Sequence, residues 1–461
     1  ISALTDFPEI LDGRLKTLHP AVHGGILARR DLPDHMSALE QMGIGTIDLV
    51  IVNLYPFVQT VTRAGVTLDQ AIENIDIGGP TMIRSAAKNY ESVAVVVDPD
   101  DYGWVIGELK SGKLDTSGRL KLARKAFQHT ASYDTAIAQY LRDEAFPEDM
   151  TIAMKKAFDL RYGENPRQRA CYYTMQDVKV VDKGLGNLVH LSGPEISFNN
   201  LLDFDSALNT LVGFTKPTVA VLKHTNPCGL ASRDSLTEAY ELALSGDPVA
   251  AFGGVVACNR TVDLATAQEI EKTHYDAIIA PDYEDKAVAL LSQKKSLRIV
   301  KAPFPAEEDD TLEFRHVRGG LLVQNRDVIG GDELTPKTAS KREPTAAEMD
   351  DLLFAWRAVK AIKSNAIALV KDSVLVGMGA GQPSRVESVA IAIKKAGERT
   401  QGSVLASDAF FPFADGPELA LEAGVTAMIE PGGSVRDNEV IETVDKKGAT
   451  LVFTGARHFK H

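Results

Sequence analysis

Short apolar runs recur along this chain, and each of them ends in a polar or glycine-rich segment. Examples are IDLVIVNLYPF at 47–57, SVAVVVDPDD at 92–101 and TVAVLKHTNPCG at 218–229. Runs of this length predict strands that are buried on both faces, as in parallel sheets covered by helices. Between the first two runs, DIGGPTMIRSAAKNY at 76–90 predicts a loop that leads into a helix. Strand, helix and strand in this order predict an α/β fold with a parallel sheet.

The length of the chain predicts more than one domain. A single hydrophobic core stops growing well below 461 residues, so we expect two or three domains. The segment 123–144 has the pattern of a long amphipathic helix, and the polar stretch FPEDMT at 146–151 follows it. We therefore place the domain boundary at this stretch, with a first domain at 1–150 and a second domain at 151–461.

The second domain contains two groups of strand-loop units. The first group includes the runs at 247–257 and 276–283, and the second group begins with SNAIALVKDSVLVGMGAGQPSR. Within this segment, KDS at 371–373 predicts a tight hairpin, and the next helix is expected to begin near Val386. The charged stretch at 332–351 has no apolar period and predicts a surface linker. The two groups indicate an internal duplication, although no sequence repeat is evident.

Composition argues against several classes of protein. The formal net charge of −13 repels a polyanion, so we expect no nucleic-acid partner, and an anionic substrate would need a locally basic pocket. No apolar run is long enough to cross a bilayer, which predicts a soluble chain with no membrane partner. The scattered cysteines Cys171, Cys228 and Cys258 are too few for a disulfide framework or a four-ligand zinc site, and they predict a cytoplasmic protein.

Lys223 and His224 form the strongest local candidate site. They follow the apolar strand TVAVL and precede TNP at 225–227, so both side chains are expected at the carboxyl end of a strand, where α/β folds bind ligands. An amine, an imidazole and an amide together suit proton transfer and the stabilisation of a developing oxyanion. An ordinary polar surface turn is the alternative. A zinc deaminase site is disfavoured, because no second cysteine follows Cys228 at the required spacing.

Further segments offer groups for a nucleotide or a heterocycle. GMGAGQPSR at 377–385 is either a phosphate-binding loop to which Arg385 adds charge or a flexible exit from a hairpin. Its spacing matches neither an ATP nor an NAD fingerprint. SDAFFPF at 407–413 places three aromatic residues beside proline, as in core packing or in a slot for a flat ring. Arg161, in RYGENP, is either a phosphate-binding cation or a solvated side chain.

The first domain gathers positive charge and a candidate trio. GRLKTLHP at 13–20 and VHGGILARR at 22–30 crowd basic residues into a short span, which indicates either a solvated face or an anion site. Tyr55 at a strand end, Asp76 before the glycines and Lys88 on the following helix are able to polarise a carbonyl or relay protons without a metal. Three unrelated polar residues are the alternative.

Eight segments resemble, in order, the serial motifs of the bifunctional AICAR transformylase/IMP cyclohydrolase family. They are GRLKTLHPAVHGGILARR, NLYPFVQTV, IDIGGPTMIRSAAKNY, LRYGENPRQ, LKHTNPCG, GMGAGQPSR, SDAFFPF and the terminal ARHFKH. The resemblance implies an N-terminal cyclohydrolase domain related to methylglyoxal synthase, with a parallel sheet. It implies a C-terminal transformylase built from two cytidine-deaminase-like α/β halves. It also implies a homodimer whose transformylase sites lie at the subunit interface.

The family resemblance assigns roles in formyl transfer to residues of the second domain. It identifies Lys223, His224 and Asn365 as the catalytic residues, AICAR as the substrate and 10-formyltetrahydrofolate as the cosubstrate. Positions that resemble the nucleotide-binding ones are Arg161, Tyr162, Asn200, Phe252, Gly253, Asp276, Phe410 and Arg457. Positions that resemble the folate-binding ones are Met378, Pro412, Phe413, Asp415 and His461.

In the first domain, the resemblance implies a second site, which would close FAICAR to IMP with loss of water and without a cofactor or metal. The family has one further segment upstream, which carries a phosphate-binding loop. Because the chain begins at Ile1 and shows no targeting segment, we expect that segment to lie upstream, and the cyclohydrolase domain is incomplete without it. The residues that match this site are the catalytic Lys16, Tyr55, Asp76 and Lys88 and the substrate-binding Thr17.

Three other functions remain alternatives to the bifunctional enzyme. The main one is a transformylase alone, with a non-catalytic N-terminal domain because the phosphate loop is absent. A nucleotide-sensing first domain predicts binding without turnover, but the joint presence of Lys16, Tyr55, Asp76 and Lys88 argues against it. A zinc nucleobase deaminase is the rival for the second domain, and it predicts stoichiometric metal.

Overall fold

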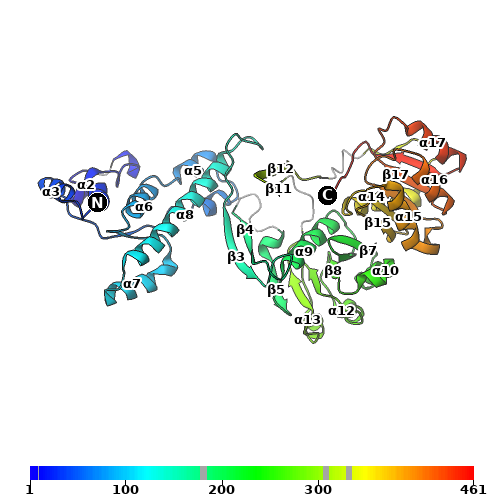
Figure 1. Cartoon of the computed structure of the whole chain (residues 1–461), viewed down its shortest axis with the longest axis horizontal. Helices are drawn as coiled ribbons and strands as arrows, with labels where there is room; N and C mark the ends of the chain where they lie inside the picture. Colours follow the sequence, from blue (N-terminus) through cyan, green and yellow to red (C-terminus); the bar gives the residue numbers. More distant parts are fainter. Residues whose placement is uncertain (9, 177–183, 305–310, 329–334) are drawn as a thin grey trace. The chain divides into compact units, whose positions relative to one another are not determined.

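The computed structural model describes residues 1–8, 10–176, 184–304, 311–328 and 335–461 (Figure 1). These residues divide into two compact units. The first unit contains Ile1–Lys155 and a short piece of chain that begins at Tyr173, and the second contains Lys156–Tyr172 and the described residues from Gly184 onward. Within the described part of the chain, no helix is both long enough and apolar enough to cross a membrane.

The first unit is built around a small parallel sheet, as the sequence predicts. β1 (Leu49–Ile51) pairs in parallel with β2 (Ala94–Val96), and α6 (Gly78–Lys88) lies between them in the chain. α8 (Thr116–Leu141) packs against α6 and β2. The first strand is shorter than the predicted run at 47–57, because Pro56 interrupts it and Phe57 begins a helix. The long helix begins earlier than predicted, because the side chain of Asp115 accepts a hydrogen bond from the N of Gly118 and caps it.

The other elements of the first unit are short helices. They are α1 (Ser2–Thr5), α2 (Pro20–Leu27), α3 (Pro33–Gln41), α4 (Phe57–Val61), α5 (Leu68–Glu73) and α7 (Tyr102–Ser111). After α8, β3 (Met154–Leu160) and β4 (Ala170–Met175) form a separate two-stranded sheet.

The second unit contains two successive sets of elements, with a separate hairpin of β11 (Leu312–Val317) and β12 (Gly320–Asn325) between them in the chain. The first set is β5 (Val189–Ser192), α9 (Phe198–Leu211), β6 (Thr218–Lys223), β7 (Asn226–Ser232), α10 (Leu236–Gly246), α11 (Pro248–Ala251), β8 (Val255–Cys258), α12 (Leu264–Glu271), β9 (Ala277–Ala280), α13 (Asp285–Leu291) and β10 (Arg298–Lys301). The second set is β13 (Lys337–Thr338), α14 (Ala346–Lys360), β14 (Ile367–Lys371), β15 (Val374–Gly379), α15 (Arg385–Ala396), β16 (Val404–Ser407), α16 (Asp415–Glu422), β17 (Ala427–Glu430), α17 (Asp437–Lys446) and β18 (Thr450–Phe453).

These two sets are copies of one topology within a single 12-stranded sheet. The strand order is β5-β10-β9-β8-β6-β7 in the first copy, followed by β15-β14-β16-β17-β18-β13 in the second. Each copy has an antiparallel hairpin, then three strands parallel to one another, and an antiparallel strand at the outer edge. β7 pairs with β15, where Ala231 meets Val374, and this pair joins the copies. The internal duplication that the sequence indicates is therefore present in the topology.

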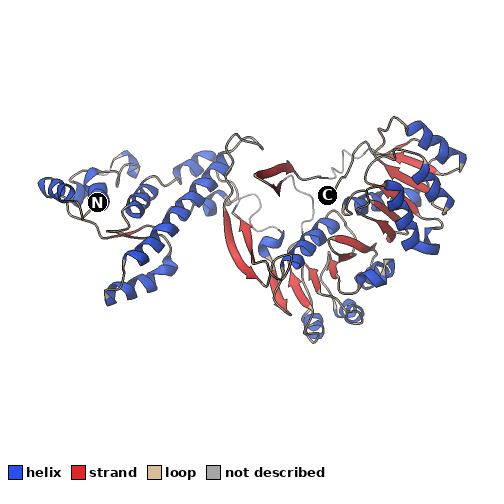
Figure 2. Cartoon of the chain, viewed as in Figure 1, coloured by secondary structure: helices blue, strands red, loops and turns tan. Residues whose placement is uncertain are grey.

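Helices cover both faces of this sheet (Figure 2). Alternate residues of β6 enter two different apolar clusters, since Val219 and Val221 face one side and Ala220 and Leu222 face the other. The first cluster contains residues of α10, α12, α13, α15, α16 and α17, and the second contains residues of α9 and α14. Burial on both faces explains why these strands are continuous apolar runs.

Three predictions about local structure in the second unit need correction. The run at 247–257 is a helical turn followed by a strand, because Pro248 follows Asp247, whose side chain caps α11. The stretch at 332–351 is not a plain linker, because β13 and the first residues of α14 lie in it, while residues 332–334 lie outside the described residues. The glycines at 377 and 379 belong to β15 rather than to a loop, whereas α15 begins at Arg385, in agreement with the predicted start near Val386.

Candidate active site

Lys223 and His224 lie at a two-residue hairpin turn. β6 ends at Lys223 and β7 begins at Asn226, so His224 and Thr225 are the turn residues. Both have positive φ values, 50° and 64°, which suit the twist of a hairpin. Residues other than glycine pay about 1 kcal/mol or more for this conformation, so contacts elsewhere must hold the turn.

Hydrogen bonds from neighbouring segments hold the turn. The N of Thr225 donates to Oδ1 of Asp203 at 2.7 Å. Nδ2 of Asn226 donates to the O of His224 at 3.0 Å, and Oδ1 of Asn226 accepts from the N of Lys363 at 3.1 Å. The second contact links the turn of the first copy to the segment of the second copy that leads to the predicted catalytic asparagine.

Two carbonyl groups fix the ammonium of Lys223. Its Nζ donates to the O of Gly253 at 2.7 Å and to the O of Phe252 at 3.1 Å. An ammonium has three N–H groups, so one remains for a ligand oxygen. Gly253 has φ 65°, and a Cβ at this position would lie 3.3 Å from Nζ of Lys223. The predicted substrate-binding residues Phe252 and Gly253 therefore lie beside the predicted catalytic lysine.

A second group of predicted nucleotide-binding residues surrounds a buried arginine. Asp276 precedes β9, and its backbone O accepts a hydrogen bond from Nη1 of Arg298 at 3.4 Å. Burial lowers the pKa of Arg298, the charge of Asp276 raises it, and the charge of Arg161 lowers it. Arg161 also lies over the ring of Tyr162, 5.5 Å from its centroid. Two neighbouring guanidinium groups suit a phosphate, and Arg298 is a residue that the sequence analysis missed.

Asn200 takes part in a capping box at the start of α9. Its Oδ1 accepts hydrogen bonds from the N and the Oγ of Ser197, at 3.0 and 2.9 Å, while its own N donates to Oγ of Ser197 at 3.2 Å. The amide oxygen is therefore engaged by the helix start, and a ligand would be bound through the amide nitrogen.

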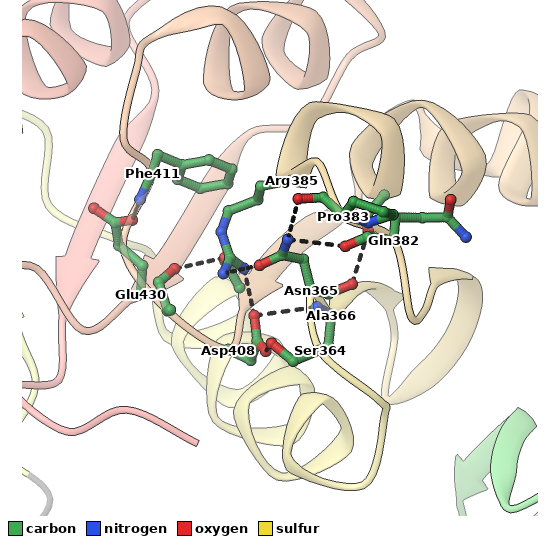
Figure 3. Close-up of polar contacts among 12 residues, drawn as sticks. Ser364, Asn365, Ala366, Gln382, Pro383, Arg385, Asp408, Phe411 and Glu430 are labelled. Atoms are coloured by element: carbon green, nitrogen blue, oxygen red, sulfur yellow. Dashed lines mark hydrogen bonds and ion pairs between the residues drawn. The ribbon is translucent and has the colours of Figure 1, made fainter. Parts of the chain in front are cut away.

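Asn365 is held by an arginine and by backbone carbonyl groups (Figure 3). Its Oδ1 accepts from Nη2 of Arg385 at 2.6 Å, and its Nδ2 donates to the O of Gln382 at 2.9 Å and of Pro383 at 3.1 Å. Arg385 also forms an ion pair with the buried Asp408. Because both N–H groups of the amide are used within the chain, Asn365 presents only its oxygen to a ligand.

The glycines of the predicted phosphate loop have a packing role. A Cβ at Gly377 would lie 2.3 Å from the O of Ala392, and a Cβ at Gly379 would lie 2.0 Å from the O of Ser388. Glycine at both positions therefore allows α15 to pack directly on β15. Arg385, at the start of α15, is buried and engaged by side chains rather than exposed on a loop.

Asn365 lies on the wall of a pocket of about 580 Å³ in the second copy. Arg457 lies over the ring of Phe459, 4.2 Å from its centroid, and Arg436 lies over the ring of Phe413 at 4.7 Å. Aromatic faces next to cations suit a flat, anionic ligand. Six predicted catalytic or ligand-binding residues line this pocket: Asn365, Phe410, Pro412, Phe413, Asp415 and Arg457.

Other predicted residues lie outside this pocket. Lys223 and His224 are not among the described residues that line it, although Asn226 of their hairpin contacts Lys363, two residues before Asn365. Met378 lies in β15 and packs partly buried against the sheet core. The terminal His461 lies close by, because its ring is 5.7 Å from that of Phe459, which lines the pocket.

The sequence analysis missed two buried carboxyl groups next to the pocket. Asp408 accepts hydrogen bonds from Arg385 and from the N of Ala366, the latter at 3.1 Å. Oε2 of Glu430 accepts from the N of Phe411 at 2.7 Å, and among the described residues no donor reaches its Oε1 (Figure 3). Burial raises the pKa of Glu430 to about 8. Asp408 directly follows the apolar strand β16, and Glu430 is the last residue of the apolar strand β17. A carboxyl residue at the end of a buried strand was the sequence signal that could have identified both.

In the first unit, Thr17 and Asp76 lie at the N-terminal end of α6. A Cβ at Gly78 would lie 2.3 Å from Oγ1 of Thr17, so the threonine side chain touches the first residue of the helix. The N of Gly79 donates to Oδ1 of Asp76 at 2.7 Å. Glycine at these two positions therefore lets both polar side chains approach the helix start.

Tyr55 lies near Asp76, whereas Lys88 does not. The hydroxyl of Tyr133 accepts from the N of Asp76 at 2.9 Å, and burial raises the pKa of Tyr133, with the charges of Asp76 and Tyr55 adding to this effect. Lys88 is the last residue of α6, about 15 Å along the helix from its first residue. Lys16 directly precedes Thr17 in the chain. One chain therefore brings most of the predicted cyclohydrolase residues to one helix end, with Lys88 at the other.

Several basic residues at 13–30 are paired with carboxylates, which favours a solvated face over an anion site there. The pairs are Arg14 with Glu73, Arg29 with Asp31, and Arg30 with Asp48.

Cys228 is a buried core residue. Burial raises the pKa of its thiol to about 12, and its Sγ lies 3.3 Å from the O of Val221. In the described ranges, no three His, Cys, Asp or Glu side chains are grouped so as to hold a metal ion.

The duplicated sheet, the anchored turn at His224 and the pocket define an α/β protein with a concave site lined by aromatic and cationic side chains. A match to the AICARFT/IMPCHase bienzyme family covers residues 86–395, and a match to the MGS-like domain covers residues 1–81. This chain belongs to the AICARFT/IMPCHase bienzyme family, and its predicted fold class, with an MGS-like N-terminal domain, is confirmed.

Similar proteins span nearly the same length. The bifunctional purine biosynthesis protein PurH of Thermoanaerobacter sp. is 50% identical over 465 residues, which cover 100% of this chain and 91% of that protein. The protein of the same description from Ruminiclostridium cellulolyticum is 48% identical over 470 residues, with the same coverage. A solved structure described as the crystal structure of ForH is 39% identical over 29% of this chain and 71% of its own, with a TM-score of 0.26.

Proposed function

We propose that the second unit carries out the formyl transfer of this bienzyme family and that the first unit carries out the ring closure. By its family membership, the chain is an AICAR transformylase and IMP cyclohydrolase of purine biosynthesis. In the first reaction, the formyl group of 10-formyltetrahydrofolate passes to the 5-amino group of AICAR and gives FAICAR. In the second, FAICAR loses water and closes to IMP. The observation that carries the transformylase assignment is the anchored Asn365 in the pocket with Phe410 and Arg457.

The proposed formyl transfer depends on removing a proton from a weak nucleophile. The lone pair of the AICAR amine is delocalised toward the carboxamide, so the amine attacks a formyl carbon poorly unless a base takes its proton. We assign this role to His224. The third N–H of Lys223 would stabilise the oxyanion that develops on the formyl oxygen and then the leaving nitrogen of the folate. The free lone pair of Asn365 Oδ1 would orient the substrate.

Nucleotide and folate are proposed to bind on different groups of residues. The two guanidinium groups near Asp276 suit the phosphate of AICAR, while the pocket suits a flat ring between aromatic side chains. On the nucleotide side we place Arg161, Tyr162, Asn200, Phe252, Gly253, Asp276, Phe410 and Arg457. On the folate side we place Met378, Pro412, Phe413, Asp415 and His461.

A homodimer is proposed as the active form, with transformylase sites at the subunit interface. Its support is the family resemblance, together with the observation that Lys223 and His224 are not among the described residues that line the pocket of one chain. Two copies would complete each site if the Lys-His turn of one subunit faced the pocket of the other. The free cysteines of the described residues are consistent with the cytoplasm as the proposed location.

The cyclohydrolase site is proposed at the N-terminal end of α6, where Thr17 and Asp76 lie and where a helix end favours an anion. Lys16 and Tyr55 are proposed to complete this site, and Lys88 is a further proposed member whose backbone lies at the other end of α6 in one chain. Ring closure needs only proton transfers at the carboxamide nitrogen and at the departing oxygen, so side chains fill all the roles and no metal is assigned.

One assay tests both assignments. The enzyme is supplied with AICAR and 10-formyltetrahydrofolate, and tetrahydrofolate and IMP are followed separately. We expect both products. Folate turnover with accumulation of FAICAR would establish a transformylase with a non-catalytic first unit, and absence of folate turnover would remove the central proposal.

A further inference from the structure

A buried carboxyl group holds the turn that carries His224. Asp203 lies on α9 between Leu201 and Phe204, whose side chains are packed in the apolar core. Its Oδ1 accepts the hydrogen bond from the N of Thr225 at 2.7 Å. Since adjacent Cα atoms are about 3.8 Å apart, this contact places the carboxyl group within one residue of His224.

The charged groups around Asp203 come from the hairpin turn and from the loop before β9. Burial raises the pKa of Asp203, the positive charges of His224 and Lys223 lower it, and the charge of Asp276 raises it. The carboxylate of Asp203 therefore lies close enough to both basic side chains for their charges to act on it, while its hydrogen bond is to the N of Thr225. A carboxylate in this position stabilises His224 more when the imidazole carries a proton than when it is neutral.

We propose that Asp203 is a positioning residue for the formyl transfer, which fixes the His224 turn and stabilises the imidazolium formed during the reaction. The proposal rests on the role of His224 given above. The amine nitrogen of AICAR forms a bond to the formyl carbon, and its proton passes to His224. The bond from the formyl carbon to N10 of the folate then breaks, and the proton passes from His224 to N10. Asp203 touches neither substrate, and it acts on the protonated state between these two transfers.

Asp203→Asn separates the charge from the hydrogen bond, because the amide keeps an oxygen for the N of Thr225. Loss of the charge is expected to lower kcat about tenfold, because the carboxylate no longer stabilises the positive charge that forms on the imidazole during the reaction. The Michaelis constant for AICAR is expected to change less than about twofold, because no substrate contact is lost. The acid limb of the pH profile of kcat/KM should move to lower pH, because a nearby negative charge that favours the protonated base has been removed.

Two matched variants isolate this effect. Asn226→Ala removes a neutral anchor of the same turn, and it should lower kcat without moving the acid limb. Asp205→Asn removes a buried carboxylate two residues away on α9. The charges that act on Asp205 are those of Arg326, Lys460 and Glu313, so this variant should also leave the acid limb in place. Asp203→Glu keeps the charge, so its acid limb should return to the wild-type position even if the longer side chain lowers kcat.

The outcomes distinguish this proposal from the assignment on which it rests. If His224→Ala turns over at nearly the wild-type rate, the proposed role of His224 is wrong. If His224→Ala is inactive but Asp203→Asn has a wild-type rate and pH profile, only the role of Asp203 is overturned. Melting temperatures of all variants show whether they are folded. If Asp203→Asn does not fold, the pH profile of Asp203→Glu is the test: an acid limb at the wild-type position supports the role of Asp203, and a displaced acid limb overturns it.

Discussion

Among single residues, Glu430 is the buried carboxyl group next to the pocket that lacks a full set of partners. Its Oε2 accepts from the N of Phe411, a residue of the pocket wall, while no described donor reaches Oε1. Burial raises its pKa from 4.5 to about 8. Because the folded protein then binds one more proton than the unfolded chain between about pH 4.5 and 8, stability falls as the pH rises through this range.

Glu430→Gln should remove this pH dependence. Glutamine keeps an oxygen for the N of Phe411 but does not ionise. Above pH 8 the variant therefore avoids the free-energy cost of ionising a buried carboxyl group, which is at most on the order of 5 kcal/mol. We expect the variant to be more resistant to urea than the wild type at pH 9, and the difference to shrink toward pH 5. If the wild type and Glu430→Gln had the same urea midpoint at pH 9 and also at pH 5, the ionisation of Glu430 would not be coupled to folding.

Gly253 supports the catalytic lysine through its lack of a side chain. We predict that Gly253→Ala lowers formyl transfer about tenfold or more, because φ 65° disfavours a Cβ and the methyl group would lie 3.3 Å from Nζ of Lys223. Gly213→Ala is the matched control, since Gly213 has φ 79° but no atom within 4 Å of a Cβ. Both variants should lose about 1 kcal/mol of stability, and only the first should lose activity. Equal activities would mean that Lys223 tolerates the methyl group.

Among the elements, α14 shows how a helix start is fixed next to an ion pair. Oγ1 of Thr345 accepts from the N of Glu348 at 3.2 Å, and Oε2 of Glu348 accepts from the N of Thr345 at 2.9 Å. Arg342 donates to both carboxylate oxygens of Glu348 and to the O of Thr426. The hydrogen bonds from Arg342 lower the pKa of Glu348 to about 2, so this contribution is present at neutral pH and is lost as the pH falls from about 4.5 toward 2.

We predict that Thr345→Ala costs about 1 kcal/mol of stability, the usual value of an N-terminal cap. Thr345→Ser keeps the hydroxyl and should cost only a small part of this amount. Urea unfolding at pH 7 measures both. A Thr345→Ala variant as stable as the wild type would mean that the Arg342 ion pair alone holds the helix start.

The sequence predicted elements well where one local signal dominated. KDS at 371–373 gave the correct hairpin, because β-strand residues flank a turn whose Asp372 and Ser373 adopt positive φ. At 247–257, an apolar run concealed a helical turn, since periodicity over a few residues does not separate a buried strand from a buried helix. The glycines at 377 and 379 resembled a ligand loop but serve helix packing, which depends on the distant residues of α15.

At the scale of the whole molecule, the duplication was visible only as a weak pattern, because the two copies share a topology rather than a sequence. Their corresponding hairpins carry different turn residues, His224 and Thr225 in β6–β7 and Asp372 and Ser373 in β14–β15. The family resemblance predicted Phe410, Phe413 and Arg457 as ligand-binding residues, and the structure shows only that they line one pocket with Asn365. The sequence did not show that Arg385 and Asp408 hold the amide of Asn365, because these contacts join segments far apart in the chain.

The division into two units predicts that the two reactions can be separated by mutation. His224 lies in the second unit, and Thr17, Tyr55 and Asp76 lie in the first. We expect His224→Ala to slow formyl transfer by about two or more orders of magnitude, as loss of a general base does, while FAICAR supplied directly is still converted to IMP at the wild-type rate. Asp76→Asn should slow the conversion of FAICAR to IMP and leave formyl transfer at the wild-type rate, since the formyl-transfer residues remain intact. A His224→Ala enzyme that has lost both reactions would mean that the units depend on each other for activity, and that the proposed division of labour is wrong.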